Sequence, residues 1–122
     1  MIEQFEQAGR AIADPSRLRI LKMLEAEELC VCQITAVLGL APATVSKHLS
    51  LLRAAGLVAQ RKAGRWIYYR LAERSINPHA PAVLALVRGV LGEDETIILD
   101  RQTLSQVKKV SVEVLCAKES RG

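Results

Sequence analysis

Three cysteines are the residues of this 122-residue chain best suited to bind a soft ligand, and a single residue separates two of them. Cys30 and Cys32 lie shortly before segment 43–55, whose pattern is that of a DNA-reading helix. Thiolates select thiophilic ions over hard cations. On a regular helix, residues two apart point about 200° away from each other. We therefore expect that one ion bound by both thiolates would unwind this turn and shift the reading helix.

The composition predicts a single, mainly helical domain. Half of the residues are hydrophobic, yet the only aromatic residues are Phe5, Trp66, Tyr68 and Tyr69. A core built mainly from leucine, valine, isoleucine and alanine with few aromatics favours helices. The chain is also short enough that dimerisation would add usefully to a modest core.

The sequence predicts neither a membrane span nor an enzyme. No apolar run approaches the roughly 20 residues that a spanning helix needs, and the first residues lack a basic region that leads into an apolar one. We therefore expect a cytoplasmic protein whose thiols stay reduced and available to a ligand. Neither a Gly-rich phosphate loop nor a metal-hydrolase motif is present, so we expect no catalytic residue and no catalytic cofactor.

The positive charge is concentrated in the middle of the chain. The net charge is +4, and residues 29–72 carry six basic residues and no acidic one. In the flanking segments the acidic residues equal or outnumber the basic ones. Such segregation is typical of a phosphate-binding surface. A solvated basic face without a partner would explain the charge equally well, so the architecture of the segment has to decide.

Hydrophobic spacing and turn residues predict a series of helices interrupted by one hairpin. Apolar residues recur at helical spacing in 2–12, and Asp14-Pro15-Ser16 caps a helix that ends near Glu25. Further helices are expected at 28–39, 42–55, 80–91 and 100–116, with a linker at 92–96. The β-prone runs 57–61 and 65–71 flank Lys62-Ala63-Gly64 and predict a hairpin with a basic tip.

These elements predict a mainly α fold with a small β-hairpin wing, an α+β winged helix-turn-helix. Two short helices joined by Leu40-Ala41-Pro42 make the helix-turn-helix, and the hairpin makes the wing. The helix at 80–91 is too apolar to lie bare on a monomer, so we expect a homodimer. We divide the chain into a DNA-binding and dimerisation domain, 1–92, and a C-terminal linker with a helical extension, 93–122.

Four fragments of the chain form a recognisable pattern. They are Ala13-Asp14-Pro15-Ser16-Arg17-Leu18-Arg19-Ile20-Leu21, Glu28-Leu29-Cys30-Val31-Cys32, Thr44-Val45-Ser46-Lys47-His48-Leu49-Ser50-Leu51-Leu52 and Gly64-Arg65-Trp66-Ile67-Tyr68-Tyr69-Arg70-Leu71. Together they resemble the ArsR/SmtB family of winged-helix metalloregulators over roughly residues 3–92. The resemblance implies a homodimeric repressor that binds double-stranded operator DNA and leaves it on binding a toxic metal or metalloid. The Leu-Cys-Val-Cys motif resembles the arsenic and antimony sensors, which implies that Cys30 and Cys32 coordinate As(III) or Sb(III) as the inducer.

The third ligand of a trivalent metalloid is not obvious. Thr35 stands where the arsenic sensors that this motif resembles carry a third cysteine, and a hydroxyl cannot replace a soft donor. Cys116 is the only other thiol. Either it packs as a small apolar residue at a helix end, or the C-terminal helix of one subunit folds back and delivers it to the pair. Cys116 is therefore the candidate third ligand, and the sequence does not indicate which subunit supplies it.

The fourth predicted helix and the wing supply the expected DNA interface. Thr44, Ser46 and Lys47 lie opposite Val45 and Leu49, on the face that a recognition helix presents to bases and phosphates. The wing-tip cations should meet the phosphate backbone of an inverted-repeat site. The residues expected at this interface are Ala43, Thr44, Ser46, Lys47, His48, Arg53, Arg61, Lys62 and Arg65.

Two residues of this region, His48 within the expected interface and Ala41 just before it, need a separate interpretation. His48 either contacts DNA or supports the edge of the core through hydrogen bonds. Ala41 is a poor N-cap, so the first amides of its helix are left for a DNA phosphate.

Other ligands and functions compete with metalloid sensing. A zinc or nickel sensor would carry His and carboxylate ligands at helical spacing in 80–91, and none is present there, whereas cadmium or lead would suit thiolates. A redox switch between Cys30 and Cys32 is disfavoured because a disulfide between residues two apart is strained. Two buried structural cysteines are disfavoured because core-facing Val31 should turn both outward. An interaction module that no longer binds DNA is the remaining alternative.

Overall fold

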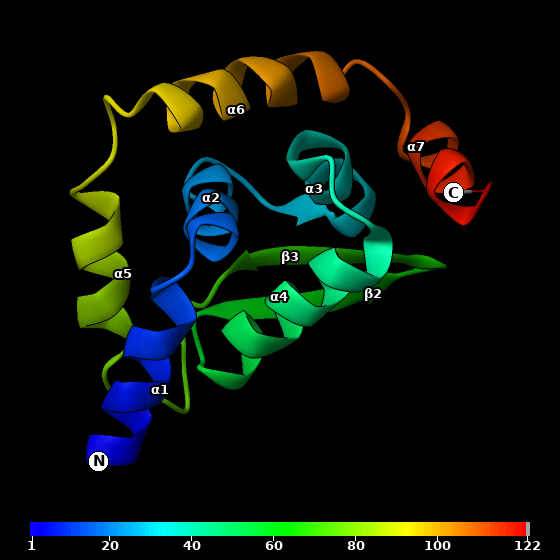
Figure 1. Ribbon diagram of the computed structural model, residues 1–122. Coiled ribbons are helices and arrows are strands. Elements are labelled where there is room, and N and C mark those ends of the chain that lie inside the picture. Colours follow the sequence, from blue (N-terminus) through cyan, green and yellow to red (C-terminus); the bar gives the residue numbers. More distant parts are fainter. Residues whose placement is uncertain (122) are drawn as a thin grey trace.

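A computed structural model describes residues 1–121, with the side chains of residues 1–118. The elements follow one another along the chain as α1 (Ile2–Ile12), α2 (Pro15–Leu24), β1 (Leu29–Cys30), α3 (Val31–Leu38), α4 (Pro42–Ala54), β2 (Val58–Ala63), β3 (Trp66–Leu71), α5 (Ala80–Arg88), α6 (Glu95–Val107) and α7 (Val112–Arg121). The predicted mainly α fold with a β-hairpin wing is confirmed (Figure 1).

The helix-turn-helix is built on local signals that the sequence states clearly. Asp14 caps α2 by accepting a 3.0 Å hydrogen bond from the Arg17 amide, and Pro15 occupies the first turn. Gly39 ends α3 with φ +68°, a left-handed conformation that glycine adopts without steric cost. The largest fully buried side chains of the core come from helices α2 to α4 and from the strands and turns beside them: Ile20, Leu21, Leu29, Ile34, Leu49, Leu52 and Leu57.

The wing belongs to a three-stranded antiparallel sheet with the order β1-β3-β2. Its β2–β3 hairpin, with Ala63 opposite Trp66, agrees with the prediction. The first strand was not predicted, because residues 28–30 were assigned to the third helix. Instead, Leu29 and Cys30 pair with Tyr69 and Tyr68. The prediction that this helix begins near Glu28 is therefore wrong, since α3 begins only at Val31.

Helix α5 is shorter than its apolar sequence suggested. It ends at Arg88 rather than Leu91. The buried Lys22 ammonium donates to the carbonyls of Val87 (3.0 Å) and Val90 (2.7 Å), so this cation binds one carbonyl in the last turn of the helix and one just beyond its end.

The predicted single helix over 100–116 is wrong, because two helices cover this part of the chain. Asp94 caps α6, which begins at Glu95, inside the predicted linker. The Ser111 hydroxyl accepts a hydrogen bond from the Val114 amide (3.3 Å) at the start of α7, and this serine separates the two helices. A partly buried ion pair fixes α6, since Arg19 donates to both carboxylate oxygens of the buried Asp100 at 2.8 and 2.9 Å.

The last two helices pack on the helix-turn-helix unit from different sides. Helix α6 runs across α2 and α3, and α7 lies against α3 near the free end of the wing (Figure 1). Both helices therefore contact the helix-turn-helix unit. Among the described residues, no helix is both long and apolar enough to span a membrane.

Candidate functional site

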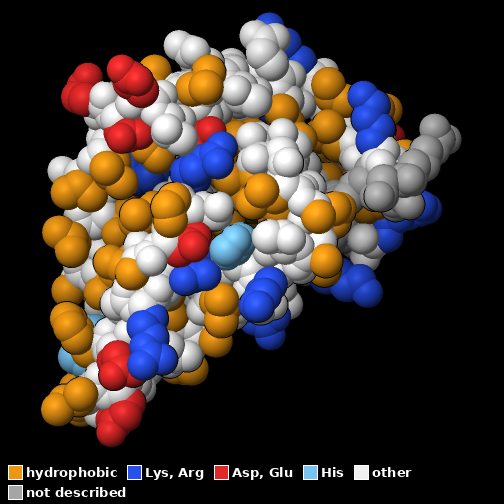
Figure 2. Space-filling view, viewed as in Figure 1, with side chains coloured by type: hydrophobic (Ala, Val, Ile, Leu, Met, Phe, Trp, Pro, Cys, Tyr) orange, Lys and Arg blue, Asp and Glu red, His pale blue; other side chains and the backbone are white. Residues whose placement is uncertain are grey.

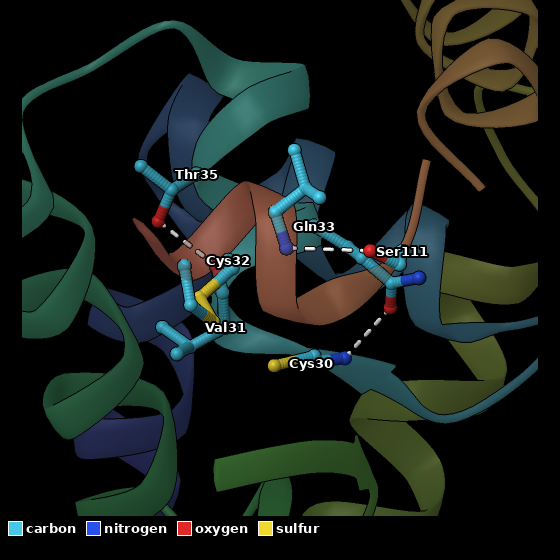
Figure 3. The surroundings of a disulfide bond; sticks show 8 residues. Cys30, Val31, Cys32, Gln33, Thr35 and Ser111 are labelled. Atoms are coloured by element: carbon cyan, nitrogen blue, oxygen red, sulfur yellow. Dashed lines mark hydrogen bonds between the residues drawn. A yellow bond between two sulfur atoms is a disulfide. The ribbon is translucent and has the colours of Figure 1, made fainter. Parts of the chain in front are cut away.

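The first two cysteines do not share one regular helix. Cys30 is the last residue of β1 and the N-cap of α3, with extended φ and ψ of −71° and 146°, whereas Cys32 lies in the first turn of α3. The Cys30 amide donates to the Gln33 side-chain oxygen at 2.9 Å (Figure 3). The predicted 200° divergence is therefore wrong, and no helical turn has to unwind for the two thiols to converge.

The burial of this segment is also the reverse of the prediction. Cys30 is fully buried and Cys32 is 6% exposed, while Val31 between them is only half-buried. The cause is the strand that precedes the helix, because the pairing of Cys30 with Tyr68 sets the direction of its side chain. The argument that Val31 turns both cysteines outward therefore fails.

Helix α7 of the same chain brings Cys116 to this pair. Cys116 lies 84 positions after Cys32 and forms a disulfide with it, with 5.4 Å between their Cα atoms. Figure 3 shows the surroundings of this disulfide. The oxidised pair is thus Cys32 with Cys116, not the Cys30–Cys32 pair considered from the sequence. No exchange between subunits is needed to supply the third thiol.

The three sulfur atoms form a compact cluster. They lie within 4.8 Å of one another, Cys30 and Cys32 buried and Cys116 half-buried. Sulfurs that share a thiophilic ion at about 2.3 Å can lie no more than about 4.6 Å apart, so the cluster is close to the size that one ion needs once the disulfide is reduced. The Thr35 hydroxyl donates to the Val31 carbonyl at 2.9 Å and takes no part in the cluster.

Helix α7 also borders both parts of the predicted DNA surface. Leu115 and Lys118 line one pocket together with Ala41 and Pro42, at the start of α4. Glu113 lines a second hollow with residues 63–66 at the tip of the wing. The helix that carries the third thiol therefore lies beside the beginning of α4 and beside the wing.

The predicted reading face of α4 is open. Ala43, Thr44, Ser46, Lys47 and Arg53 are all exposed, while Val45 and Leu49 are buried. No side chain caps the helix at Ala41, as its sequence predicted. Lys and Arg side chains lie over α4 and along the wing in the space-filling view (Figure 2).

His48 differs from these neighbours because it is half-buried. An Arg17 guanidinium nitrogen lies 3.2 Å from His48 Nδ1, and Asp14 lies 3.9 Å from the same atom. Arg17 also donates to the Ala11 carbonyl at 2.8 Å. Arg17 and His48 are 31 positions apart, so nothing local in the sequence connects them and only the fold brings them together.

The basic residues of the wing are not equivalent. Arg61 lies in β2 opposite Tyr68, not at the tip, and forms an ion pair with Glu28 at 2.6 Å. The hydrogen-bonded Arg61 guanidinium lowers the pKa of Glu28. Lys62 and Arg65 are exposed nearer the turn. Glu28 precedes the acid-free segment, so charge counting along the sequence could not reveal that it neutralises Arg61.

Comparison with known proteins agrees with this architecture. A family model for bacterial regulatory proteins of the arsR family matches residues 14–60. The transcriptional regulator CmtR of Mycobacterium bovis is 44% identical over 86 residues, 70% of this chain and 70% of CmtR. The chain belongs to the arsR family of bacterial regulatory proteins. Membership in this family of regulators agrees with the prediction that the chain is not an enzyme.

This arsR-family chain is also similar to a repressor and to a DNA-binding domain of known structure. The arsenical resistance operon repressor of Escherichia coli K12 is 42% identical over 82 residues. These make up 66% of this chain and 66% of the repressor, so the chain spans slightly less than two thirds of that protein's length. The homodimeric winged helix-turn-helix DNA-binding domain of Mb0332 from Mycobacterium bovis is 33% identical, with a TM-score of 0.62 over 72% of this chain and 78% of that structure.

Proposed function

We propose that this chain is a homodimeric repressor that leaves its operator when As(III) or Sb(III) binds Cys30, Cys32 and Cys116. The observation that carries the proposal is the convergence of three sulfur atoms within 4.8 Å beside a winged helix-turn-helix. Soft thiolates favour thiophilic ions, and a trivalent metalloid can take three of them. A relative named an arsenical resistance operon repressor supports the choice of arsenic.

Residues 1–92 would carry DNA binding and dimerisation. The open face of α4 would enter the major groove with Thr44, Ser46 and Lys47, Ala43 and Arg53 flanking them. Lys62 and Arg65 would contact phosphates, which adds affinity but little sequence information. Arg61 would contact a phosphate only after its ion pair with Glu28 breaks. His48 would support the helix through its contact with Arg17.

Exposed apolar side chains favour a dimer formed through α1 and α5. Ile2 and Phe5 are 81% and 58% exposed, and Leu86 on α5 is 59% exposed. In the space-filling view, hydrophobic side chains line the edge where these two helices lie (Figure 2). A second copy would cover this edge and present two reading helices to an inverted repeat. The structural relative from Mycobacterium bovis is described as homodimeric.

Residues 93–122 would couple the thiols to the DNA surface. Ligation of Cys116 would hold α7 against α3, with Glu113 beside the wing tip and Lys118 beside the start of α4. A carboxylate at the wing opposes phosphate binding. If the inducer binds this docked state more tightly than the DNA-bound state, it lowers DNA affinity, and DNA lowers inducer affinity by the same factor.

The test is operator release by the reduced protein. A duplex selected from random sequence serves as operator in an anisotropy assay, titrated with arsenite, antimonite, cadmium, lead and zinc. Cys30→Ser and Cys32→Ser should bind DNA normally and ignore arsenite. Cys116→Ser should need at least tenfold more arsenite, about 1.4 kcal/mol of lost coupling. Val114→Ser, an exposed position on the same helix, should respond like the wild type.

Normal release by either single mutant of Cys30 or Cys32 would contradict the proposal. If cadmium or lead releases DNA at lower concentrations than arsenite, the site belongs to a divalent-ion sensor of the same fold. If none of these forms binds DNA, the chain is an interaction module that does not bind DNA.

A thiol redox switch is a second candidate, and the Cys32–Cys116 disulfide is the observation that favours it. Oxidation would tie α7 to α3 without any ion. Peroxide should then release DNA from wild type and from Cys30→Ser, but not from Cys116→Ser. A metalloid sensor, in contrast, loses its response in all three single cysteine variants or becomes much less sensitive.

A further inference from the structure

A small pocket, open to solvent where Ala36, Ala41 and Lys118 are exposed, adjoins the thiol cluster on the side facing α4. Its volume is about 300 Å³. Helix α3, the start of α4 and helix α7 supply its lining: Cys32, Thr35, Ala36, Ala41, Pro42, Leu115 and Lys118. One wall of the pocket is thus a cysteine of the cluster itself.

The lining suits an apolar group rather than a hydrated ion. Alanine, proline and leucine side chains form most of the wall, and the stem of Lys118 is aliphatic up to its ammonium group. The Thr35 hydroxyl donates its hydrogen to the Val31 carbonyl, so it does not offer that hydrogen to a ligand. Of the three cysteines only Cys32 lines the pocket, so most of this space lies outside the thiol cluster.

We propose that the pocket is a subsite for the organic substituent of a monosubstituted trivalent arsenical, with its arsenic atom bound by Cys32 and one further thiol. The inference rests on the proposed function and specifies its ligand class. An arsenical with one carbon substituent has two exchangeable oxygen positions left, so two thiolates complete it. Since Cys32 lines the pocket, a substituent on arsenic bound there is within reach of Ala36 and Leu115.

The binding step is balanced without any oxidant. For each of the two thiols, the sulfur gives its proton to a hydroxyl on arsenic, one As–O bond breaks, one As–S bond forms, and one water leaves. Arsenic stays trivalent throughout. The Cys32–Cys116 disulfide has to be reduced beforehand by an external dithiol, because only thiols can exchange in this way.

The size of the pocket favours an aromatic substituent over a methyl group. Water occupies about 30 Å³ per molecule in the liquid, so a pocket of about 300 Å³ has the volume of roughly ten waters. A methyl group would leave most of it wet. A phenyl ring would reach both the α3 wall and the α7 wall and bury more apolar surface.

The experiment compares arsenicals on matched variants of the reduced chain. Wild type is titrated with phenylarsine oxide, methylarsonous acid and arsenite, while free thiols are counted and affinities are measured by competition with a dithiol. Ala36→Leu fills the pocket, and Ala54→Leu adds the same side chain at an exposed position of α4 outside it. Leu115→Ala removes the α7 wall as an independent second variant. Circular dichroism checks that each variant folds.

Two thiols should be consumed per phenylarsine oxide and three per arsenite. Ala36→Leu should weaken the binding of phenylarsine oxide at least tenfold and change the affinity for arsenite less than twofold. Ala54→Leu should change neither affinity. Leu115→Ala should weaken the phenyl compound more than the methyl one. If these variants change all three arsenicals in parallel, or none of them, the subsite is refuted. If no arsenical consumes thiols even in wild type, the proposed function itself fails.

Discussion

Oxidation of Cys32 with Cys116 should stabilise the protein strongly, and the structure allows the size of the effect to be worked out. The two residues are 84 positions apart. A cross-link that closes a loop of this length lowers the entropy of the unfolded chain by the equivalent of about 4.5 kcal/mol at 25 °C. Measured gains for disulfides fall more often at about 2–4 kcal/mol. We therefore expect the oxidised form to gain at least about 2 kcal/mol in free energy of unfolding.

The assay is urea unfolding of oxidised and reduced protein at one protein concentration, because a dimer's stability depends on concentration. Cys116→Ser should unfold like the reduced wild type with or without reductant. Cys30→Ser keeps both partners of the disulfide and should retain the full gain on oxidation. A gain below about 1 kcal/mol in wild type, or loss of the gain in Cys30→Ser, would refute the pairing of Cys32 with Cys116.

Three further perturbations test the fold and the DNA surface. Asp100→Ala leaves the Arg19 guanidinium without its carboxylate. Breaking a fully buried ion pair costs about 3–5 kcal/mol, and because Arg19 is 24% exposed we expect urea unfolding to show a loss of about 2–3 kcal/mol. A loss below about 1 kcal/mol would contradict the role of this pair as the anchor of α6. Asp14→Ala should cost about 1 kcal/mol at pH 7. The hydrogen bond from the Arg17 amide lowers the pKa of Asp14 below 3.8, so the cap stabilises above that pH and loses its effect as the pH falls through the lowered pKa. Wild type and variant should therefore converge in acid, and a constant difference would contradict the cap. Lys47→Ala and Arg65→Ala should each reduce the slope of log affinity against log salt by roughly 0.9, and an unchanged slope would remove that residue from the phosphate contacts.

The elements governed by local signals could be predicted from the sequence. The Asp14-Pro15 cap, the Gly39 stop and the alternation around Gly64 each act within a few residues, and the helix-turn-helix and hairpin were expected where the structure has them. The break at Ser111 was missed because it contains neither glycine nor proline, and a serine cap is a weaker local signal.

The geometry of the thiol site could not be predicted, because it depends on contacts that are distant in sequence. Cys30 is extended because Tyr68 pairs with it, and nothing near residue 30 announces that strand. Cys116 meets Cys32 only because α6 crosses α2 and α3 before α7 turns back. The residue types identified the three sulfurs as candidates, but only the tertiary fold brings them together.

The long interval between Cys32 and Cys116 has a consequence during protein synthesis. A ribosome releases the helix-turn-helix and the wing well before it reaches α7, and such units can begin to fold as they emerge. A chain broken off before Cys116 would keep the proposed DNA-reading part with only two of the three thiols. Paired with an intact chain, this fragment would give a dimer with one complete thiol site, which should need more inducer before it leaves DNA. Errors late in translation would then produce a subunit that lowers the inducer sensitivity of the dimer rather than a merely inactive one.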